Sequence, residues 1–416
     1  MVDMLIEAVL VSLLGVGLGS ALGLLPGMHI NNILPLILSM SFLFSSPLVL
    51  TVFIVSIAVS QILTSYIPSI FLGAPEEGTA LCVLPGHRLL FEGRGYEAIK
   101  LSIIGSLGSL VATLAIIAIF SSTFAYIYDL SRPYIHYLIS LVALMMIFSE
   151  KKLKKILSAV LVFALSGIFG IFVLNSSILT KQHSLFPVLS GLFGLCLLII
   201  SMSEESKIPP QTDDNEMKIR KKEIIKSIFL GSIAGILVGM LPAIGVSQAA
   251  TMVQYLGSTG EARSFLMTVS GINVANEVFS LVSLYLVGNP RSGASVAIQQ
   301  ILGGLNTNQV IFLIGFICFS TGLASYLTLF LGKKIPKYLE KVNYKQLTLV
   351  IILFVVSLVT ALTGFSGLLI LFTAVSIGLL CNYLNIRKSH CMGVLLLPSI
   401  LFFAGLNPII SEILGI

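Results

Sequence analysis

The chain has 416 residues; 56% are hydrophobic, only 10% are charged, and the formal net charge is +6 at pH 7. Apolar runs near the length needed to cross a hydrocarbon core of about 30 Å recur from end to end, which excludes a soluble globular protein and indicates a polytopic integral membrane protein. Lysines in the loops between these runs explain the positive charge better than a nucleic-acid surface does, so no nucleic-acid partner is expected.

The apolar segments number seven in each half of the chain. They lie near 4–25, 29–44, 48–72, 97–121, 131–149, 154–175 and 184–202, and then near 226–241, 245–256, 264–288, 308–332, 346–363, 366–385 and 391–413. The first lacks a basic n-region and a small-residue cleavage site, so we expect a retained helix and not a signal peptide. The pattern predicts an all-α polytopic membrane protein with about 10–14 membrane segments.

Two patterns each occur twice. Gly-x3-Gly-x3-Gly-x-Leu-Pro occurs as Gly15, Gly19, Gly23, Leu25 and Pro26 and again as Gly231, Gly235, Gly239, Leu241 and Pro242. Gly-x-Pro-x-x-Gly follows as Gly73, Pro75 and Gly78 and again as Gly288, Pro290 and Gly293. The copies are offset by 216 and 215 residues, so we predict a first repeat at 1–202, a polar cytoplasmic linker at 203–225 and a second repeat at 226–416.

The basic residues outside the apolar segments predict the topology. They cluster as Arg88, Arg94 and Lys100; Lys151, Lys152, Lys154 and Lys155; Lys218, Arg220, Lys221 and Lys222; Lys333, Lys334, Lys337, Lys341 and Lys345; and Arg387 and Lys388. All five clusters can be cytoplasmic only if both termini are extracytoplasmic, and the repeats are then inverted. The uncharged stretch Ser295–Gln309 is expected to be an external loop, in a multi-pass protein of the cell membrane.

The segments 29–44 and 245–256 are short or polar at their starts, and each follows a Leu-Pro pair. Proline removes a backbone donor and glycine admits unusual dihedral angles, so a broken or re-entrant helix is predicted in each half. The N-terminus of each new helix would favour an anion. The candidate substrate-binding residues here are Pro26, Gly27, His29, Asn31, Asn32, Pro242, Gly245, Ser247 and Gln248. The alternative is that the glycines only let helices pack closely.

Polar residues inside the apolar segments suggest an ion-coupling site. Glu277 lies well inside the segment 264–288, with Asn273 and Asn276 at helical spacing beside it. The matching segment of the first half carries Gln61 in a similar stripe. An intramembrane carboxylate is costly, so Glu277 is the first candidate for a proton or sodium site. Such stripes also occur as plain interhelical hydrogen bonding.

The two proline–glycine segments differ in charge. The first carries Glu76 and Glu77 between its proline and its second glycine, and the second carries Arg291 and Ser292. If they converge, Arg291 could hold an anionic headgroup while an acid of the first segment titrates or pairs with it. The alternative places each segment in water at the membrane surface.

Metal and cofactor chemistry has no signature here. The five cysteines, Cys82, Cys196, Cys318, Cys381 and Cys391, are scattered singly, so we expect structural thiols without a zinc site or a disulfide framework. Histidine, cysteine and acidic residues show no metal-ligand spacing, and no phosphate-binding P-loop is present, so neither a cofactor nor an ATP-driven motor is expected.

The Gly-x3-Gly-x-Leu-Pro breaks and the proline–glycine segments resemble the large permease subunit of the tripartite tricarboxylate transporter family, best over 15–110 and 231–305. The resemblance implies a multi-spanning permease for carboxylate anions that works with a small membrane subunit and an extracytoplasmic binding protein. It also implies that Pro26-Gly27, Pro242-Ala243, Gly73–Gly78 and Gly288–Gly293 line the substrate site.

Three hypotheses follow. The leading one is a secondary transporter for an organic anion such as a carboxylate, coupled to H⁺ or Na⁺ and working by alternating access. The second is a translocase for a lipid-linked phosphate such as polyprenyl phosphate, with Arg291 at the phosphate. The third, ranked last, is a membrane enzyme acting through Glu76, Glu77 and His29, because a one-sided catalyst has no need of inverted repeats.

Overall fold

A computed structural model describes residues 2–25, 30–75, 77–124, 126, 130, 132–175, 181–203, 209–212, 217, 219–240, 245–256, 261–288, 290–339 and 344–406. Within these ranges all regular secondary structure is helical, which confirms the predicted all-α class. Eight of the helices searched there are long and apolar enough to cross a membrane, and further apolar helices are shorter. The protein is therefore a multi-pass membrane protein.

The helices of the first half are α1 (Val2–Leu24), α2 (Ile30–Ser39), η1 (Ser41–Leu43), α3 (Pro47–Thr64), α4 (Tyr66–Leu72), η2 (Glu77–Cys82), α5 (Val83–Phe91), α6 (Gly95–Phe120), η3 (Ser121–Thr123), η4 (Arg132–Tyr134), α8 (Ile135–Phe148), α9 (Leu153–Asn175), α10 (Lys181–Leu189), the π-helical η5 (Ser190–Leu195) and α11 (Cys196–Ser203). Those of the second half are α12 (Lys221–Met240), α13 (Val246–Leu256), α14 (Ala262–Val287), α15 (Gly293–Leu302), α16 (Thr307–Leu339), α17 (Tyr344–Tyr383), η6 (Lys388–Met392) and α18 (Gly393–Phe403).

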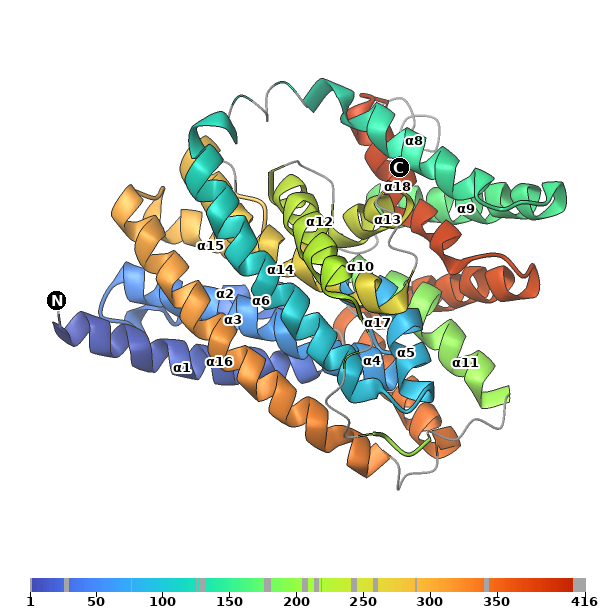
Figure 1. Ribbon diagram of the computed structural model, residues 1–416, viewed down its shortest axis with the longest axis horizontal. Coiled ribbons are helices and arrows are strands. Elements are labelled where there is room, and N and C mark those ends of the chain that lie inside the picture. The colour runs from blue at the N-terminus through green and yellow to red at the C-terminus, as the bar shows by residue number, and fades with distance from the viewer. Residues whose placement is uncertain are drawn as a thin grey trace.

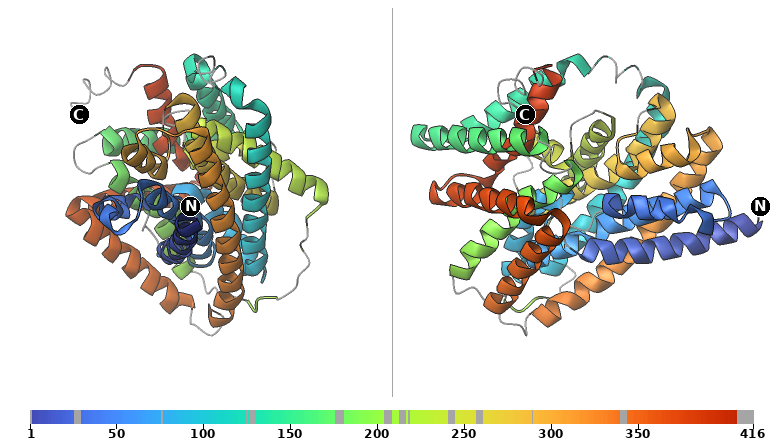
Figure 2. Two further views of the ribbon diagram at one scale, coloured as in Figure 1. Left: turned by 90° about the vertical axis from the view of Figure 1, so that its left-hand side faces the viewer. Right: turned by 180° about the vertical axis from the view of Figure 1, so that it is seen from behind.

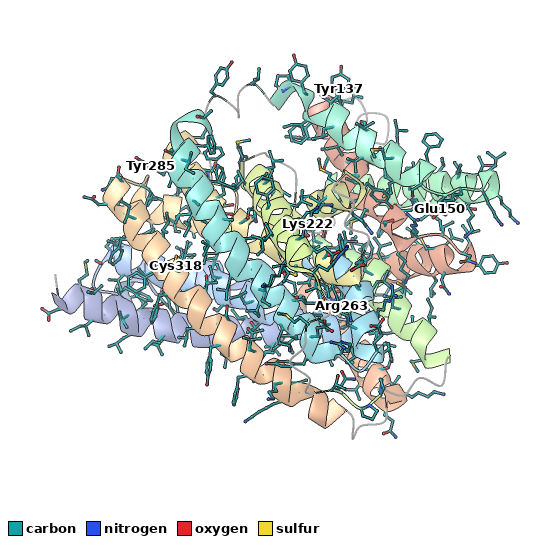
Figure 3. The ribbon with its side chains drawn as sticks, viewed as in Figure 1. Tyr137, Glu150, Lys222, Arg263, Tyr285 and Cys318 are labelled. Atoms are coloured by element: carbon teal, nitrogen blue, oxygen red, sulfur yellow. The ribbon has the colours of Figure 1, made fainter. Side chains whose placement is uncertain are left out.

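The helices form two bundles, and each half of the chain contributes to both. The first bundle packs α1, α3 and α6 against α12, α14 and α16, and the second packs α8 to α11 against α17 and α18 (Figure 1). The views in Figure 2 place the start of α1 at the edge of the molecule away from the second bundle. Figure 3 places Arg263 and Tyr285, near the two ends of α14, well apart, so α14 runs through the first bundle.

The glycines of the two patterns lie at two helix contacts of the first bundle, α1 on α3 and α12 on α14. A Cβ atom at Gly19 would overlap with Ile57 and Ser60, and one at Gly235 would lie 2.7 Å from the carbonyl oxygen of Ile272. Small residues allow such close backbone approach between membrane helices. The packing interpretation of the glycines is therefore supported in both halves, at positions that match by the same offset.

The third long helix of each half crosses the second long helix of the other half. α16 packs on α3, where the hydroxyls of Ser12, Ser56 and Ser320 form hydrogen bonds of 2.9–3.0 Å. α6 packs on α14, where the Ser106 hydroxyl donates to the carbonyl of Ser270 at 3.4 Å. The two crossings use comparable positions of the two halves. The third long helix of each half therefore packs on the other half.

α6 and α16 run antiparallel, side by side in Figure 1. Gly332, near the end of α16, lies against Ile99, near the start of α6. The same end of the molecule holds the polar linker, whose Thr212 N–H donates to the carbonyl of Gly93 at 2.9 Å. The Lys155 ammonium likewise donates to the carbonyl of Asn385 at 2.7 Å, so two of the basic clusters meet.

One expected loop is helical in the structure, and one expected break between segments is present. The expectation that Ser295–Gln309 is a loop is wrong, because Ser292 caps the N-terminus of α15 and Gly303, at φ 71°, ends it. The expected separation of 346–363 from 366–385 has a counterpart inside α17, where Gly364 adopts φ 64° and ψ −156°. Only glycine adopts that conformation readily, so α17 consists of two helical arms.

Candidate functional site

Two short helices follow the predicted breaks. α2 has 10 residues and α13 has 11, so each is about 15 Å long and covers half of a hydrocarbon core. The Gln61 side-chain oxygen accepts a hydrogen bond from Ile30 N at the start of α2, at 3.0 Å. At the start of α13, Gln248 accepts from Gly245 N at 2.8 Å and Ser247 is buried.

Several predicted site residues lie outside what the structure describes. Pro26, Gly27, His29, Glu76 and Pro242 are outside the described residues altogether. The backbones of three others belong to helices, but their side chains are outside the described set: Asn31, Asn32 and Glu77. Their proposed roles stay predictions.

The short helices meet the opposite halves of the chain. α2 of the first half packs against α15, which follows the second proline–glycine segment. α13 of the second half packs against η2, which follows the first proline–glycine segment. The structure thus brings each short helix into contact with the helix at the proline–glycine segment of the other half.

One face of α14 contacts both proline–glycine segments. The Asn273 amide donates to the Tyr66 hydroxyl at 2.6 Å and to the carbonyl of Gly78 at 2.9 Å. Glu277, one turn further along the same face, accepts from the Ser292 hydroxyl at 3.0 Å. The two segments therefore lie one helical turn apart along α14.

Both segments begin with the same local structure. Gly73 ends α4 and Gly288 ends α14, each in the left-handed conformation, with φ 65° and 68°. The Ser292 hydroxyl accepts from Ser295 N at 3.2 Å and caps α15, and the Arg291 N–H donates to the Ser295 hydroxyl at 3.0 Å. Glycine is the common choice at this position because a Cβ atom disfavours φ > 0.

The surroundings of the two segments differ. Pro75 is buried and packs near Gly194 of the π-helical η5, so this proline is enclosed by protein and not by water. Gly288 is exposed and Pro290 is half-buried. The side-chain oxygen of Asn276 accepts a long hydrogen bond, 3.5 Å, from Ser280.

Sequence patterns did not identify Tyr66 or His87 as members of this region. Tyr66 is fully buried and holds Asn273, while the His87 ring lies beside Gly73. Burial lowers the pKa of His87 to about 4, so the ring is neutral at physiological pH. Neither residue belongs to a repeated pattern. The one signal in the sequence is that both lie within 14 residues of Gly73.

Three of the cysteines come together in space, although they are scattered along the chain. The sulfur atoms of Cys381 and Cys391 lie 3.3 Å apart, and the Lys388 ammonium donates to the sulfur of Cys196 at 2.8 Å. All five cysteines are free thiols, and no group of metal-ligating side chains occurs in the part of the chain that was searched. Lys388 thus has a buried environment that its place in a basic loop did not suggest.

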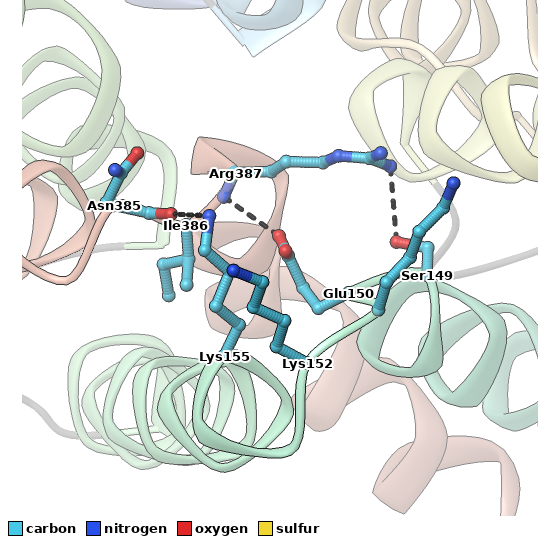
Figure 4. Close-up of a pocket in the computed structure, with 8 residues that line it drawn as sticks. Ser149, Glu150, Lys152, Lys155, Asn385, Ile386 and Arg387 are labelled. Carbon is cyan, nitrogen blue, oxygen red and sulfur yellow. Dashed lines mark hydrogen bonds between the residues drawn. The ribbon is translucent and has the colours of Figure 1, made fainter.

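Two cavities lie at the end of the molecule where the basic clusters meet. The outer cavity, about 480 Å³, is lined by Ser149, Glu150, Lys151, Lys152, Lys155, Asn385, Ile386 and Arg387 (Figure 4). The inner cavity, about 460 Å³, is lined by Ala80, Leu81, Leu84, Pro85, Arg88, Phe193, Gln254, Glu261, Ala262, Phe265, Arg387, Lys388 and Ser389. Arg387 belongs to both.

Glu150 anchors the wall of the outer cavity. Its carboxylate accepts from Arg387 N at 3.2 Å and lies 3.2 Å from His390 Nε2. Burial alone would raise the pKa of Glu150, but the hydrogen bonds from Arg387 and His390 outweigh it and lower the pKa below its usual value. Glu150 is therefore ionised at neutral pH and already satisfied by the protein.

Comparison with known proteins decides the family. The model of the tripartite tricarboxylate transporter TctA family matches residues 9–393. The chain belongs to the TctA family. It is also 34% identical over 406 residues to an uncharacterized protein of Methanocaldococcus jannaschii, MJ1079, covering 94% of this chain and 98% of that protein. No solved structure matches this chain.

Membership of the TctA family confirms the resemblance inferred from the glycine and proline patterns. The matched range includes both glycine patterns, both short helices and both proline–glycine segments. A transporter family and the long apolar helices together make this chain a membrane transport protein of the permease type.

Proposed function

We propose that this TctA-family chain is a secondary active permease that moves an organic anion such as a carboxylate, coupled to H⁺ or Na⁺, by alternating access. The observation that carries the proposal is the exchange of partners across the first bundle: α2 with α15, and α13 with η2. Such an arrangement lets one central site open to either side as the halves rock. The role is transport and not catalysis.

The proposed architecture is a pair of inverted repeats, 1–202 and 226–416, joined by a cytoplasmic linker at 203–225. The antiparallel course of α6 and α16, and the matched glycine contacts, support it. The meeting of basic clusters and linker at one end supports a cytoplasmic assignment for that end, with both termini extracytoplasmic.

In this proposal α2 and α13 are re-entrant, and their N-termini face the anion. The dipole of each helix and its first N–H groups favour negative charge. Arg291 would contact a carboxylate of the substrate, and Glu277 would carry the coupling ion on the adjacent turn of α14. The name of the family suggests a tricarboxylate substrate and a tripartite assembly, so we expect a small membrane subunit and an extracytoplasmic binding protein as partners.

The test is uptake of radiolabelled citrate into proteoliposomes under an imposed pH or Na⁺ gradient. We expect Glu277→Gln and Arg291→Ala to lower uptake at least 100-fold, because each removes a charge that the cycle requires. Glu223→Gln, on α12 at an ion pair with the preceding Arg220, serves as a matched carboxylate control and should transport normally. Wild-type protein that accumulates no carboxylate under either gradient would contradict the proposal.

The second candidate is a translocase for a lipid-linked phosphate. An apolar cavity of about 570 Å³ between α1, α2 and α3, lined by Leu18, Ile33, Ile37 and Phe53 among others, favours it, because an acyl or prenyl chain could lie there. Transfer of a fluorescent polyprenyl phosphate between leaflets, lost in Arg291→Ala, would establish this function in place of carboxylate uptake.

A further inference from the structure

Lys388 is a buried cation. Lys388 is one of the residues that line the inner cavity, only 8% of it is exposed, and its ammonium donates at 2.8 Å to the thiol of Cys196, which is not among the lining residues. Among the described residues no carboxylate lies within 4 Å of it. A sulfur atom is a weak acceptor, and burying an ammonium without an anionic partner is costly. Lys388 is therefore a cation in the wall of the inner cavity that no carboxylate of the described residues neutralises.

The remaining charges of the inner cavity leave an excess of positive charge. Arg88 and Arg387 stand beside Lys388, and Glu261 is the one acid among the lining residues. Arg88 pairs with Glu92 at 3.2 Å, and the Arg387 guanidinium donates to Ser149 at 3.2 Å, so both arginines are held at the rim by the protein. Lys388 supplies the buried charge in the wall.

The inner cavity lies beside the proposed substrate pathway. Ala80 and Leu81 of η2 form one wall and Gln254 of α13 another, and these two elements are the packed pair that joins the first half to the second. The cavity volume of about 460 Å³ falls within the range of roughly 300–1,000 Å³ typical of small-molecule sites. A small carboxylate with some of its water would fit.

We propose that the inner cavity is the cytoplasmic binding site of the transported anion, with Lys388 as the buried residue that binds a substrate carboxylate and Gln254 and Ser389 as neutral hydrogen-bonding groups. This inference rests on the proposed function. In the transport cycle the anion would occupy the inner cavity when it enters from the cytoplasm or is released to it.

The experiment measures citrate binding to purified protein in detergent by isothermal calorimetry, and citrate exchange across proteoliposomes from each side. Lys388→Gln should weaken citrate binding at least tenfold and raise KM on the cytoplasmic side alone. Lys388→Arg keeps the charge and should stay within about threefold of wild type. The matched control is Lys152→Gln, which lines the outer cavity and should bind citrate as wild type does.

The outcomes separate this inference from the proposed function. Citrate binding by Lys388→Gln as tight as by wild type, or no citrate binding by wild type, would overturn the inference. Citrate that binds through Lys388 but is never transported would contradict the proposed function and leave this inference intact. Removal of an uncompensated buried charge should not unfold the protein, so loss of the folded peak of Lys388→Gln in gel filtration would also contradict the inference.

Discussion

The two proline–glycine segments share one local structure and have opposite surroundings. Gly73 and Gly288 both end a helix in the left-handed conformation. A Cβ atom at Gly73 would lie 2.8 Å from the His87 ring, whereas one at Gly288 would meet nothing within 4 Å. The first segment is thus wedged between η5 and α14, and the second stands at an open edge beside α15.

This difference shows how a duplicated pattern acquires two roles. The backbone requirement is local, so both copies keep the glycine. The contacts come from whatever packs on each copy, and only the first is held by an amide of the other half, Asn273. We therefore expect the first segment to contribute mainly to stability and the second to contribute mainly to substrate contact.

The largest effect is expected from alanine at the two glycines. Both substitutions place a Cβ atom at positive φ, which costs about 1–2 kcal/mol. Gly73→Ala must also displace the His87 ring, so it should lower the free energy of unfolding by about 3 kcal/mol. Gly288→Ala should lower it by about 1 kcal/mol. Thermal unfolding in detergent measures the difference, and equal losses would show that the surroundings do not matter.

A smaller effect is expected from Asn273→Ala. It removes the hydrogen bonds to Tyr66 and Gly78 and leaves a buried hydroxyl and a partly buried carbonyl without them, at a cost of about 2 kcal/mol. Asn276→Ala, three residues further on α14, should cost about 0.5 kcal/mol, because its contact with Ser280 is long. A similar loss of stability in both variants would remove the link that we assign to Asn273.

An effect on stability smaller than that of Asn273→Ala is expected from Ser292→Ala at the second segment. The variant loses the N-cap of α15 and the hydrogen bond to Glu277, worth about 1 kcal/mol together. Because this segment is the one proposed to contact substrate, citrate uptake should fall more than stability does. A variant with full uptake and a much lower midpoint of thermal unfolding would show that the second segment contributes to stability and not to substrate contact.

Local signals predicted the long helices well. The expected segments 97–121 and 264–288 correspond to α6 and α14, which begin two residues earlier and end one residue earlier. Strong hydropathy over twenty or more residues determines such helices with little help from packing. α15 was missed because it has only 10 residues, and its capping box, made by Ser292 and Ser295, is a weak signal in a sequence.

The candidate site was only partly predictable. Gln61, Asn273 and Glu277 were identified because polar residues are rare in apolar segments, and all three make contacts with the short helices or the proline–glycine segments. Lys388 was assigned to a surface cluster, because composition cannot distinguish a lysine in a loop from one folded beneath it.

Sequence alone determined that the chain lies in a membrane and that it is helical, since both follow from the composition of short stretches of the chain, and it displayed the two repeated patterns directly. Only the tertiary structure decided which half packs on which, the approach of Lys388 to Cys196, and the burial of that lysine. The physical reason is that these features depend on contacts between segments more than a hundred residues apart, and such contacts are selected by the packing of whole helices.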